Sequence, residues 1–547
     1  MATIHHSNRE NEYLPDDKNN SVTVTNLDGK YTIDQAVEFI GFGRAQIYLS
    51  FMAGIIWMAD AMELTILSIV SPEVRCMWDL TSYQEAFITT VVFVGMGISS
   101  SWWGNLCDRF GRKVGLLLCA AWTTYFGFIS ALSPNYFWLI ILRGMTGFGI
   151  GGAPQSVTLY SEFLPTKTRG RCIMAIEIFW AIGTVFEVFL ALIIMPTLGF
   201  RWLLAISAIP LVAVVLAFNV MPESPRFNQA RGRTDLAQQT LEYVARVNGK
   251  RLPSAGLKPP AKANNTTSNL PQNSTSNASG GATNGDATIH PSQETPHATE
   301  SSGNISELFK DPVSRKTTWL LWLIWFQCAF AYYGLVLLST SLFKETEEYP
   351  DTGVNDTQQC DSEMKDECAL SCKTLTNDDY ADLLWVTLAE FPGLLITLLL
   401  LEVVGRKSTM AITFAGFGIS SLCVLAAHSR QALTFFLFTA RALISGGFQA
   451  AYVYTPEVFP TKVRALALGS CSGFSRLGAL ITPFVSQVLV ENNKTLAIFF
   501  YAILSILAAI CALMLPIETK GRKLSDEGVD EGVNSTGMGR NDQRRSR

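Results

Sequence analysis

Several stretches of this chain carry no Asp, Glu, Lys or Arg over 20 residues or more, and apolar side chains dominate them. The clearest are 202–222, 317–343, 408–427 and 495–517. Because about 20 apolar residues in a helix span the core of a bilayer, each stretch predicts a membrane-spanning helix. Only 16% of the 547 residues are charged, against about 25% in an ordinary soluble domain. These features exclude a single soluble globule.

Length sets the number of spans. Polar stretches at 1–45, 222–315, 342–380 and 522–547 stand apart by composition, and the remainder accommodates about twelve spanning helices with short connections. The remaining spans are predicted at 46–71, 85–104, 114–161 (two helices joined by a turn at 133–135), 172–196, 382–401, 431–454 and 465–490.

The two halves of the chain share an internal repeat. The sequence at 160–169 recurs at 454–464, and Gly-Arg-Lys at 111–113 recurs at 405–407. A repeat of this length indicates duplication. The predicted fold is therefore an all-α integral membrane bundle with twelve transmembrane helices in two pseudo-symmetric six-helix halves.

The positions of the cations predict orientation. Lys and Arg gather in the loops after spans two, four, eight and ten, and such loops face the cytoplasm. The predicted organisation is a cytoplasmic tail at 1–45, a six-helix half at 46–221, a cytoplasmic linker at 222–316 with a disordered Asn/Ser/Thr-rich segment at 254–304, a second half at 317–517 that includes a luminal loop at 342–380, and a cytoplasmic tail at 518–547.

Four cysteines fall on the luminal side of this topology, where oxidising conditions allow two disulfides. They are Cys76, Cys360, Cys368 and Cys372. Three pairings are open at this stage, and so are free thiols. Asn355, in a luminal sequon, is the predicted glycan acceptor.

The charged turns carry a family resemblance. Residues 104–113 resemble the loop signature of the major facilitator superfamily, whereas 222–226 and 516–521 resemble its sugar and organic-ion branches. Further segments resemble a vesicle-membrane group of the same superfamily, and this resemblance implies residence in synaptic or other secretory vesicles. These segments are 40–43, 57–63, 147–156 and 445–454.

The same turns predict a cytoplasmic gate, in which charges of neighbouring loops pair and then separate as the halves rock. A compatible alternative is that the cations mainly fix topology. The predicted gate residues are Asp108, Arg109, Arg112, Glu162, Arg169, Glu223, Arg226, Arg406, Glu457, Arg464 and Glu518.

Ionisable residues inside membrane spans are costly and mark functional candidates. The set for proton coupling or substrate binding is Asp60, Glu63, Arg143, Glu177, Glu187, Glu390, Arg441 and Arg476. Asp60 and Glu63 lie on one helix face and cannot easily both ionise there. The resemblance implies that Asp60 in span one works against Arg143 in span four. Proton coupling, a structural Asp60–Arg143 pair and an uncoupled carrier all stay open, as do an anion-binding and a salt-bridge role for Arg476.

Polar and aromatic residues of the spans are predicted to line a midplane cavity, with packing or an interfacial belt as the alternative. They are Trp57, Gln155, Trp180, Tyr332, Tyr333, Gln449 and Tyr452. Span seven lacks the Gln-Gln-Leu-Ser-Gly pattern of hexose carriers at 326–334, which disfavours a hexose substrate.

The predicted function is secondary active transport of a small organic, charged solute by alternating access, coupled to protons, by a monomeric unit in the lipid bilayer of a vesicle. The alternative is a non-transporting sensor, receptor or trafficking scaffold that binds cytoplasmic proteins. We expect no enzyme activity, catalytic residues, cofactor, metal or nucleic acid, because the sequence has neither a metal-ligand cluster nor a nucleophile with a histidine partner.

Overall fold

The structure is a computed structural model that describes residues 30–218, 221–253, 256–259, 305–346 and 375–521. Helices account for nearly all regular structure in these ranges, and the single β-bridge among them joins Tyr31 to Leu257. The linker segment 254–304 and the loop 342–380 fall mostly outside the described residues.

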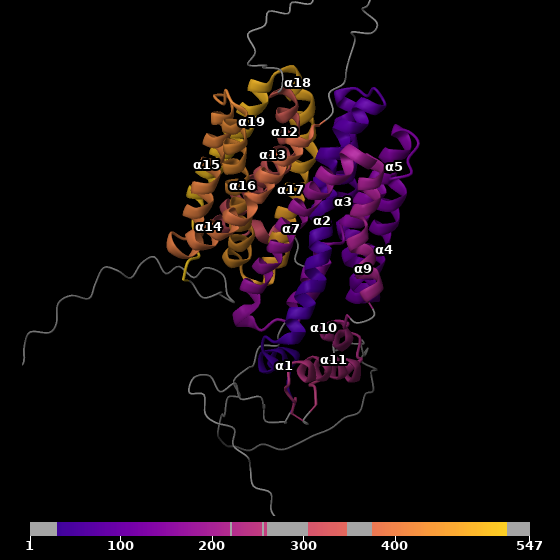
Figure 1. Cartoon of the computed structure of the whole chain (residues 1–547). Coiled ribbons are helices and arrows are strands. Elements are labelled where there is room, and N and C mark those ends of the chain that lie inside the picture. Colours follow the sequence, from indigo (N-terminus) through magenta and orange to yellow (C-terminus); the bar gives the residue numbers. More distant parts are fainter. Residues whose placement is uncertain (1–29, 219–220, 254–255, 260–304, 347–374, 522–547) are drawn as a thin grey trace, which may run out of the picture.

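The helices form two halves that stand side by side, indigo to magenta and orange to yellow (Figure 1). The N-terminal half contains α2 (Arg44–Met77), α3 (Ser82–Phe110), α4 (Arg112–Ser130), α5 (Tyr136–Ile150) with α6 (Pro154–Ser161), α7 (Thr166–Leu198), and α8 (Phe200–Ser207) with α9 (Ile209–Ala217). The C-terminal half contains α12 (Pro312–Thr346), α13 (Asn377–Leu388) with α14 (Glu390–Val403), α15 (Arg406–Val424), α16 (Arg430–Val458), α17 (Thr461–Pro483) with η3 (Phe484–Leu489) and α18 (Val490–Asn492), and α19 (Lys494–Met514). The predicted all-α fold with two six-helix halves is confirmed.

Ten helices of the described chain are long and apolar enough to cross a membrane. The other two crossings are α5 with α6, which is interrupted between Ile150 and Pro154, and α16, whose polar residues lower its hydropathy. Glycine allows α5 to pack tightly, because a Cβ on Gly147 would lie 2.3 Å from the backbone oxygen of Val92. The Gly-rich run therefore serves helix packing.

A helical cap covers one end of the N-terminal half (Figure 1). It consists of α1 (Ile33–Ile40), α10 (Pro225–Ala230) and α11 (Thr234–Val247), none of which was predicted within the tail and the linker. Asn248 accepts a hydrogen bond from the Ala45 amide at 2.9 Å and donates one to Gln46 at 2.7 Å. The cap is thus tied to the first turn of α2, and we call this end of the bundle the cap end.

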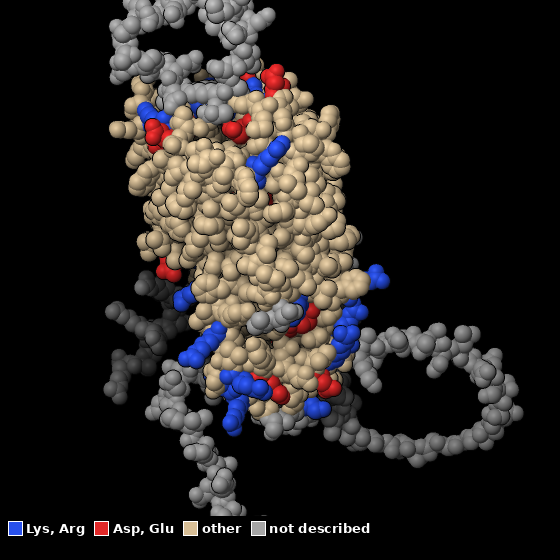
Figure 2. Space-filling view, turned by 45° about the vertical axis from the view of Figure 1, so that its right-hand side comes forward, with Lys and Arg blue, Asp and Glu red and all other residues tan. Residues whose placement is uncertain are grey.

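Charged side chains gather toward the two ends of the molecule and leave a wide band of uncharged surface between them (Figure 2). Many large apolar side chains of the described residues are strongly exposed, including Leu216 at 75% and Ile98 at 68%. Such a belt matches the hydrocarbon core of a bilayer.

Polar contacts join the halves at the end opposite the cap. Arg75 of α2 contacts Glu491 of α18 at 2.6 Å and Glu85 of α3 at 3.2 Å. Gln487 lies in η3, a π-helical turn, and donates to Ser71 at 3.0 Å. Such turns re-aim side chains out of the regular helical register. We call these five residues the α18-end clasp.

Candidate substrate and coupling site

The N-terminal half holds a buried ion pair between Glu63 of α2 and Arg143 of α5. Arg143 Nη1 lies 2.8 Å from Glu63 Oε2, and both side chains are at most 2% exposed. Arg143 Nη2 donates to the Ser130 hydroxyl at 2.9 Å. The Ser130 bond offsets part of the cost of burying this pair, although Arg143 Nε has no hydrogen-bond partner among the described residues.

The expected partnership of Asp60 with Arg143 is wrong, since Glu63 takes that place. One helical turn separates the two acids along α2. Ser130, the hydrogen-bond partner of Arg143, marks the level of the guanidinium on α4. Glu63 lies beside Gly127, one turn of α4 from Ser130. Asp60 interacts with Cys119, which is two turns further from Ser130 along α4. The guanidinium of Arg143 lies at the level of Glu63.

Asp60 is only 6% exposed, and its Oδ1 has no hydrogen-bond partner among the described residues. It interacts attractively with Arg476 of α17, in the other half, and repulsively with Glu63 and Glu177. A buried carboxylate oxygen without a partner is costly. This unpaired oxygen distinguishes Asp60 from Glu63 and Glu390, each of which has an arginine partner.

Glu177 of α7 connects the two halves at the same level. It accepts hydrogen bonds from Trp57 Nε1, at 3.3 Å, and from Gln449 of α16. Both partners are neutral, so neither of these hydrogen bonds supplies a positive charge to Glu177.

Glu187 lies further along α7 and is completely buried. Its Oε1 accepts a hydrogen bond from Ser207 at 2.8 Å, and its Oε2 has no partner among the described residues. The carboxyl group also interacts with both members of the Glu63–Arg143 pair.

The C-terminal half contains a second buried pair, in which Arg441 of α16 lies 2.6 Å from Glu390 of α14. The Tyr332 hydroxyl donates to Glu390 at 2.6 Å and accepts from Arg441 Nη2 at 3.2 Å. Trp180 Nε1 donates to the same hydroxyl at 2.6 Å, and Thr184 Oγ1 donates to Glu390 at 3.4 Å. Residues of α7 thus reach across the interface into this network.

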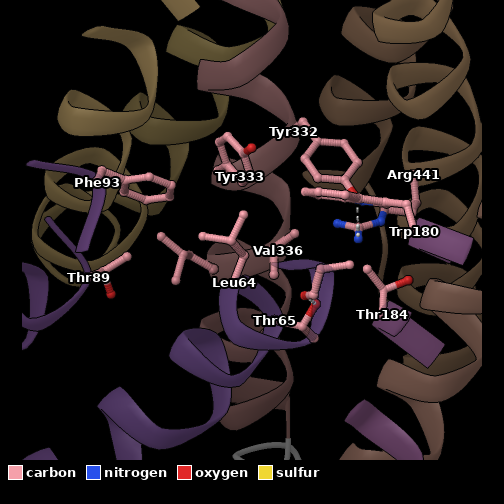
Figure 3. Close-up of a pocket in the computed structure, with 12 residues that line it drawn as sticks. Leu64, Thr65, Thr89, Phe93, Trp180, Thr184, Tyr332, Tyr333, Val336 and Arg441 are labelled. Carbon is pink, nitrogen blue, oxygen red and sulfur yellow. Dashed lines mark hydrogen bonds between the residues drawn. The ribbon is translucent and has the colours of Figure 1, made fainter. Parts of the chain in front are cut away.

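A small cavity lies beside this network, between the halves, and Figure 3 shows Tyr332, Trp180 and Arg441 grouped on one side of it. Its lining residues are Ala61, Leu64, Thr65, Thr89, Phe93, Trp180, Thr184, Tyr332, Tyr333, Val336, Leu337 and Arg441. Sequence reasoning missed the threonines, because a single Thr within an apolar span gives no distinguishing signal.

The residues expected to line a cavity separate into three groups. Trp180, Tyr332 and Tyr333 line the cavity described above, Trp57 and Gln449 hold Glu177, and Tyr452 packs on Trp325 with ring centroids 4.4 Å apart. Gln155 does not belong with them. It lies on α6, beyond the interruption of that helix, and accepts a hydrogen bond from Arg112 at 3.1 Å.

Arg112 and Arg406 organise two equivalent clusters at the cap end. Arg112 contacts Glu162 and Asp108, each at 3.1 Å, and Arg406 contacts both oxygens of Glu457 at 3.0 and 3.1 Å. Each of these ion pairs joins two residues of the same half. The expectation that they separate when the halves rock is therefore wrong for these pairs, because neither partner moves relative to the other in such a motion.

Two further acids cap helices in these clusters. Glu223 accepts from the Lys113 amide at 3.1 Å, and Glu518 accepts from the amides of Arg406 and Lys407 at 2.9 and 3.1 Å. Burial raises the pKa of Glu518, but hydrogen bonds from Arg406, Lys520, Lys407 and Thr519 outweigh it, so the pKa lies below its ordinary value of 4.5.

The remaining predicted gate residues have separate surroundings. Arg109 lies over the Phe110 ring, Arg169 donates to the Leu164 carbonyl at 3.2 Å, Arg226 pairs with Asp34 at 2.5 Å, and Arg464 lies in the first turn of α17. Cys76 is disulfide-bonded, and because the other seven described cysteines are free, its partner lies outside the described residues. Cys360, Cys368, Cys372 and Asn355 also lie outside them.

Two family models match the chain. Residues 48–348 match the "Sugar (and other) transporter" family, and residues 383–542 match the "Major Facilitator Superfamily". The chain belongs to the major facilitator superfamily, whose members are membrane transporters.

Individual relatives narrow the comparison further than the two family models do. The synaptic vesicle 2-related protein of Xenopus laevis is 48% identical over 504 residues, which cover 92% of this chain and 84% of the relative, and that of Rattus norvegicus is 47% identical over 94% and 87%. The organic cation/carnitine transporter 7 of Arabidopsis thaliana is 37% identical over 91% and 96%. The expected relationship to a vesicle-membrane group is confirmed by these names.

Solved structures support the fold. A partially occluded, inward-open xylose transporter from E. coli aligns with a TM-score of 0.64 at 15% identity, over 88% of this chain and 99% of that one. At this identity the likeness concerns the fold alone.

Proposed function

We propose that this transporter carries a small organic, charged solute by secondary active transport in a secretory-vesicle membrane, and that protons couple to transport through Asp60. The vesicle location is supported by the names of the two synaptic vesicle 2-related proteins described above. Both termini and the cap are assigned to the cytoplasm, because Arg109, Arg112 and Arg406 lie at the cap end.

The observation that carries the proposal is the environment of Asp60. Glu63 and Glu390 each form a close ion pair, but Asp60 is almost fully buried and leaves Oδ1 without a partner. Its only attractive charge among the interactions named above is Arg476, from the opposite half. A carboxyl group between two moving halves changes its surroundings whenever they move, so its proton affinity follows the conformation.

Alternating access is supported by the distribution of contacts between the halves. Arg75 and Glu491 of the α18-end clasp join the halves, whereas the Arg112 and Arg406 ion pairs stay within one half each. Rocking about the midplane would open the clasp and leave the cap-end pairs intact.

The test compares the small-molecule content of acidified vesicles that carry the wild type, Asp60→Asn, or the control Asp235→Asn, all at matched protein levels. Asp235 is an exposed residue of α11 and makes the same chemical change outside the site. We expect a solute enriched by the wild type and the control and lost in Asp60→Asn.

If no solute differs between wild-type vesicles and vesicles without the protein, transport is rejected and the scaffold alternative takes its place. If Asp60→Asn vesicles still enrich the solute, the proposal of transport stands and proton coupling through this residue is rejected.

A further inference from the structure

The charges of the ionisable residues predicted as functional within the spans do not balance. Of the eight ionisable residues predicted as functional, five are acids and three are arginines. The Glu63–Arg143 and Glu390–Arg441 contacts form two neutral pairs. Asp60, Glu177, Glu187 and a single cation, Arg476, remain.

Glu187 lies apart from the others, beside the Glu63–Arg143 pair. It is completely buried and its only hydrogen bond among those described comes from Ser207. Since an ionised carboxylate with an unpaired oxygen is costly there, Glu187 is a neutral acid. The remaining group, which we call the central cluster, consists of Asp60, Glu177 and Arg476, and it holds one acid more than it holds bases.

The central cluster is a single electrostatic unit drawn from both halves. The phenols of Tyr333 on α12 and Tyr452 on α16 each interact with Asp60, Glu177 and Arg476. The titratable and charged groups that act on Asp60 or respond to it are Glu63, Cys119, Glu177, Tyr333, Tyr452 and Arg476. Arg476 is the one cation in this set, so one negative charge is left to be neutralised.

Aromatic rings surround the cluster. Trp57 donates a hydrogen bond to Glu177, and its ring centroid lies 5.5 Å from that of Trp180. The ring centroids of Tyr333 and Phe93 are 5.0 Å apart. Trp180, Tyr333 and Phe93 also line the cavity of Figure 3. Ala61, the residue after Asp60, lines the same cavity. Aromatic faces attract cations, most strongly where water is excluded.

We infer that the central cluster binds either one proton or one organic monocation, so that the transporter exchanges protons for organic cations. This inference rests on the proposed function. When the ammonium group of the solute arrives, the O–H bond of the protonated carboxyl breaks, the proton leaves to the water on the side to which the site is open, and the ammonium takes over its charge. On the other side the two steps reverse, with one proton moved for each cation. An anionic solute is disfavoured, because Arg476 is already balanced by one of the two carboxylates.

The experiment measures proton release from the purified full-length protein in weakly buffered detergent solution, with a pH dye. The probes are tetraethylammonium and phenethylammonium, with benzoate and xylose as an anionic and a neutral control. We expect about one proton per bound monocation and none with benzoate or xylose. Asp60→Asn and Glu177→Gln should each reduce release at least tenfold, whereas Glu187→Gln, outside the cluster, should retain it.

Binding of neither monocation, monocation binding without proton release, or release that persists in both cluster variants would overturn the inference. The vesicle assay separates this result from failure of the proposed function. If the enriched solute is anionic or neutral and its enrichment depends on Asp60, proton-coupled transport stands and cation exchange is rejected. Absence of any enriched solute rejects transport itself.

Discussion

Arg143 and Arg441 are equivalent residues of the internal repeat, but they take their carboxylates from helices that are not equivalent. Arg143 pairs with Glu63 on the first helix of its half, and Arg441 pairs with Glu390 on the second. Tyr332 lies on α12 about as far from the helix start as Glu63 lies on α2, and its hydroxyl contacts Arg441. In the C-terminal half the phenol of Tyr332 therefore takes the place of the Glu63 carboxylate, and the negative charge that pairs with Arg441 comes from Glu390.

The position of Glu187 beside the Glu63–Arg143 pair predicts that this acid compensates when Glu63 is removed. In Glu63→Gln, Arg143 cannot lose its proton, but Glu187 interacts with it and can ionise instead. We expect a modest loss of stability from Glu63→Gln alone, and a loss of about 3–5 kcal/mol from Glu63→Gln combined with Glu187→Gln, since the guanidinium is then buried without a carboxylate. Thermal unfolding in detergent would measure both. Additive effects of the two substitutions would contradict the compensation by Glu187.

The capping role of Glu518 predicts a dependence of stability on pH. Its pKa in the folded protein lies below 4.5, so its contribution is fully present above the unfolded pKa and is lost as pH falls through the folded pKa. We expect Glu518→Gln to lower the free energy of unfolding by about 1 kcal/mol at neutral pH, the usual size of a capping interaction. The difference from the wild type should shrink only below pH 4.5. A difference that grows as pH falls would show that the ionised form is not the stabilising one.

Close packing of α17 on α12 predicts a contrast between two glycines of the same helix. A Cβ on Gly478 would lie 2.3 Å from the backbone oxygen of Phe326, whereas a Cβ on Gly473 meets no atom within 4 Å. Gly478→Ala should destabilise the protein by about 1–3 kcal/mol, because backbone must move. Gly473→Ala should be neutral or stabilising by up to about 1 kcal/mol, through helix propensity. Equal melting temperatures for the two variants would argue against this contact.

The α18-end clasp predicts that Arg75→Gln opens that end of the bundle. Leu67, buried between the halves one turn from Ser71, serves as a reporter when it is replaced by cysteine. An exposed ion pair contributes up to about 1 kcal/mol. We therefore expect Leu67→Cys to react with a water-soluble maleimide about fivefold faster in the Arg75→Gln background.

The matched control is Arg430→Gln, which removes an arginine that pairs with Asp379 and Asp382 inside one half. It should leave the rate at Leu67→Cys unchanged. Equal acceleration by both substitutions would indicate general loosening of the protein and not release of the clasp.

Much of the fold was predictable, because membrane insertion and duplication leave strong marks on a sequence. Hydropathy alone misses α16, but Arg441 and the repeat at 454–464 reveal it. The cap was missed for a physical reason. The buried face of α11 is small, since it consists of Ala237, Leu241, Val244 and Ala245. The partners of that face come from a different part of the chain.

The candidate site was predictable as a set of residues but not as a set of contacts. Every acid and arginine of the central region is rare enough in a span to be noticed in the sequence. The choice between Asp60 and Glu63 as the partner of Arg143 depends on the level at which α4 and α5 pack against α2, and helical spacing within α2 contains no information about that level. The same holds for Gln155, whose position depends on the interruption between α5 and α6.

The cap also bears on the order in which the protein is made. Its contacts described above, from Asn248 to Ala45 and Gln46, together with those from Lys250 to the Phe39 carbonyl and from Glu38 to the Thr166 amide, all join residues that precede position 260. Because the ribosome synthesises the chain from the N-terminus, it has added both partners of each contact before it reaches Pro312, the first residue of α12. At about 5–20 residues per second, the intervening residues take several seconds. The N-terminal half can close and seal its own end while the other half has yet to be synthesised.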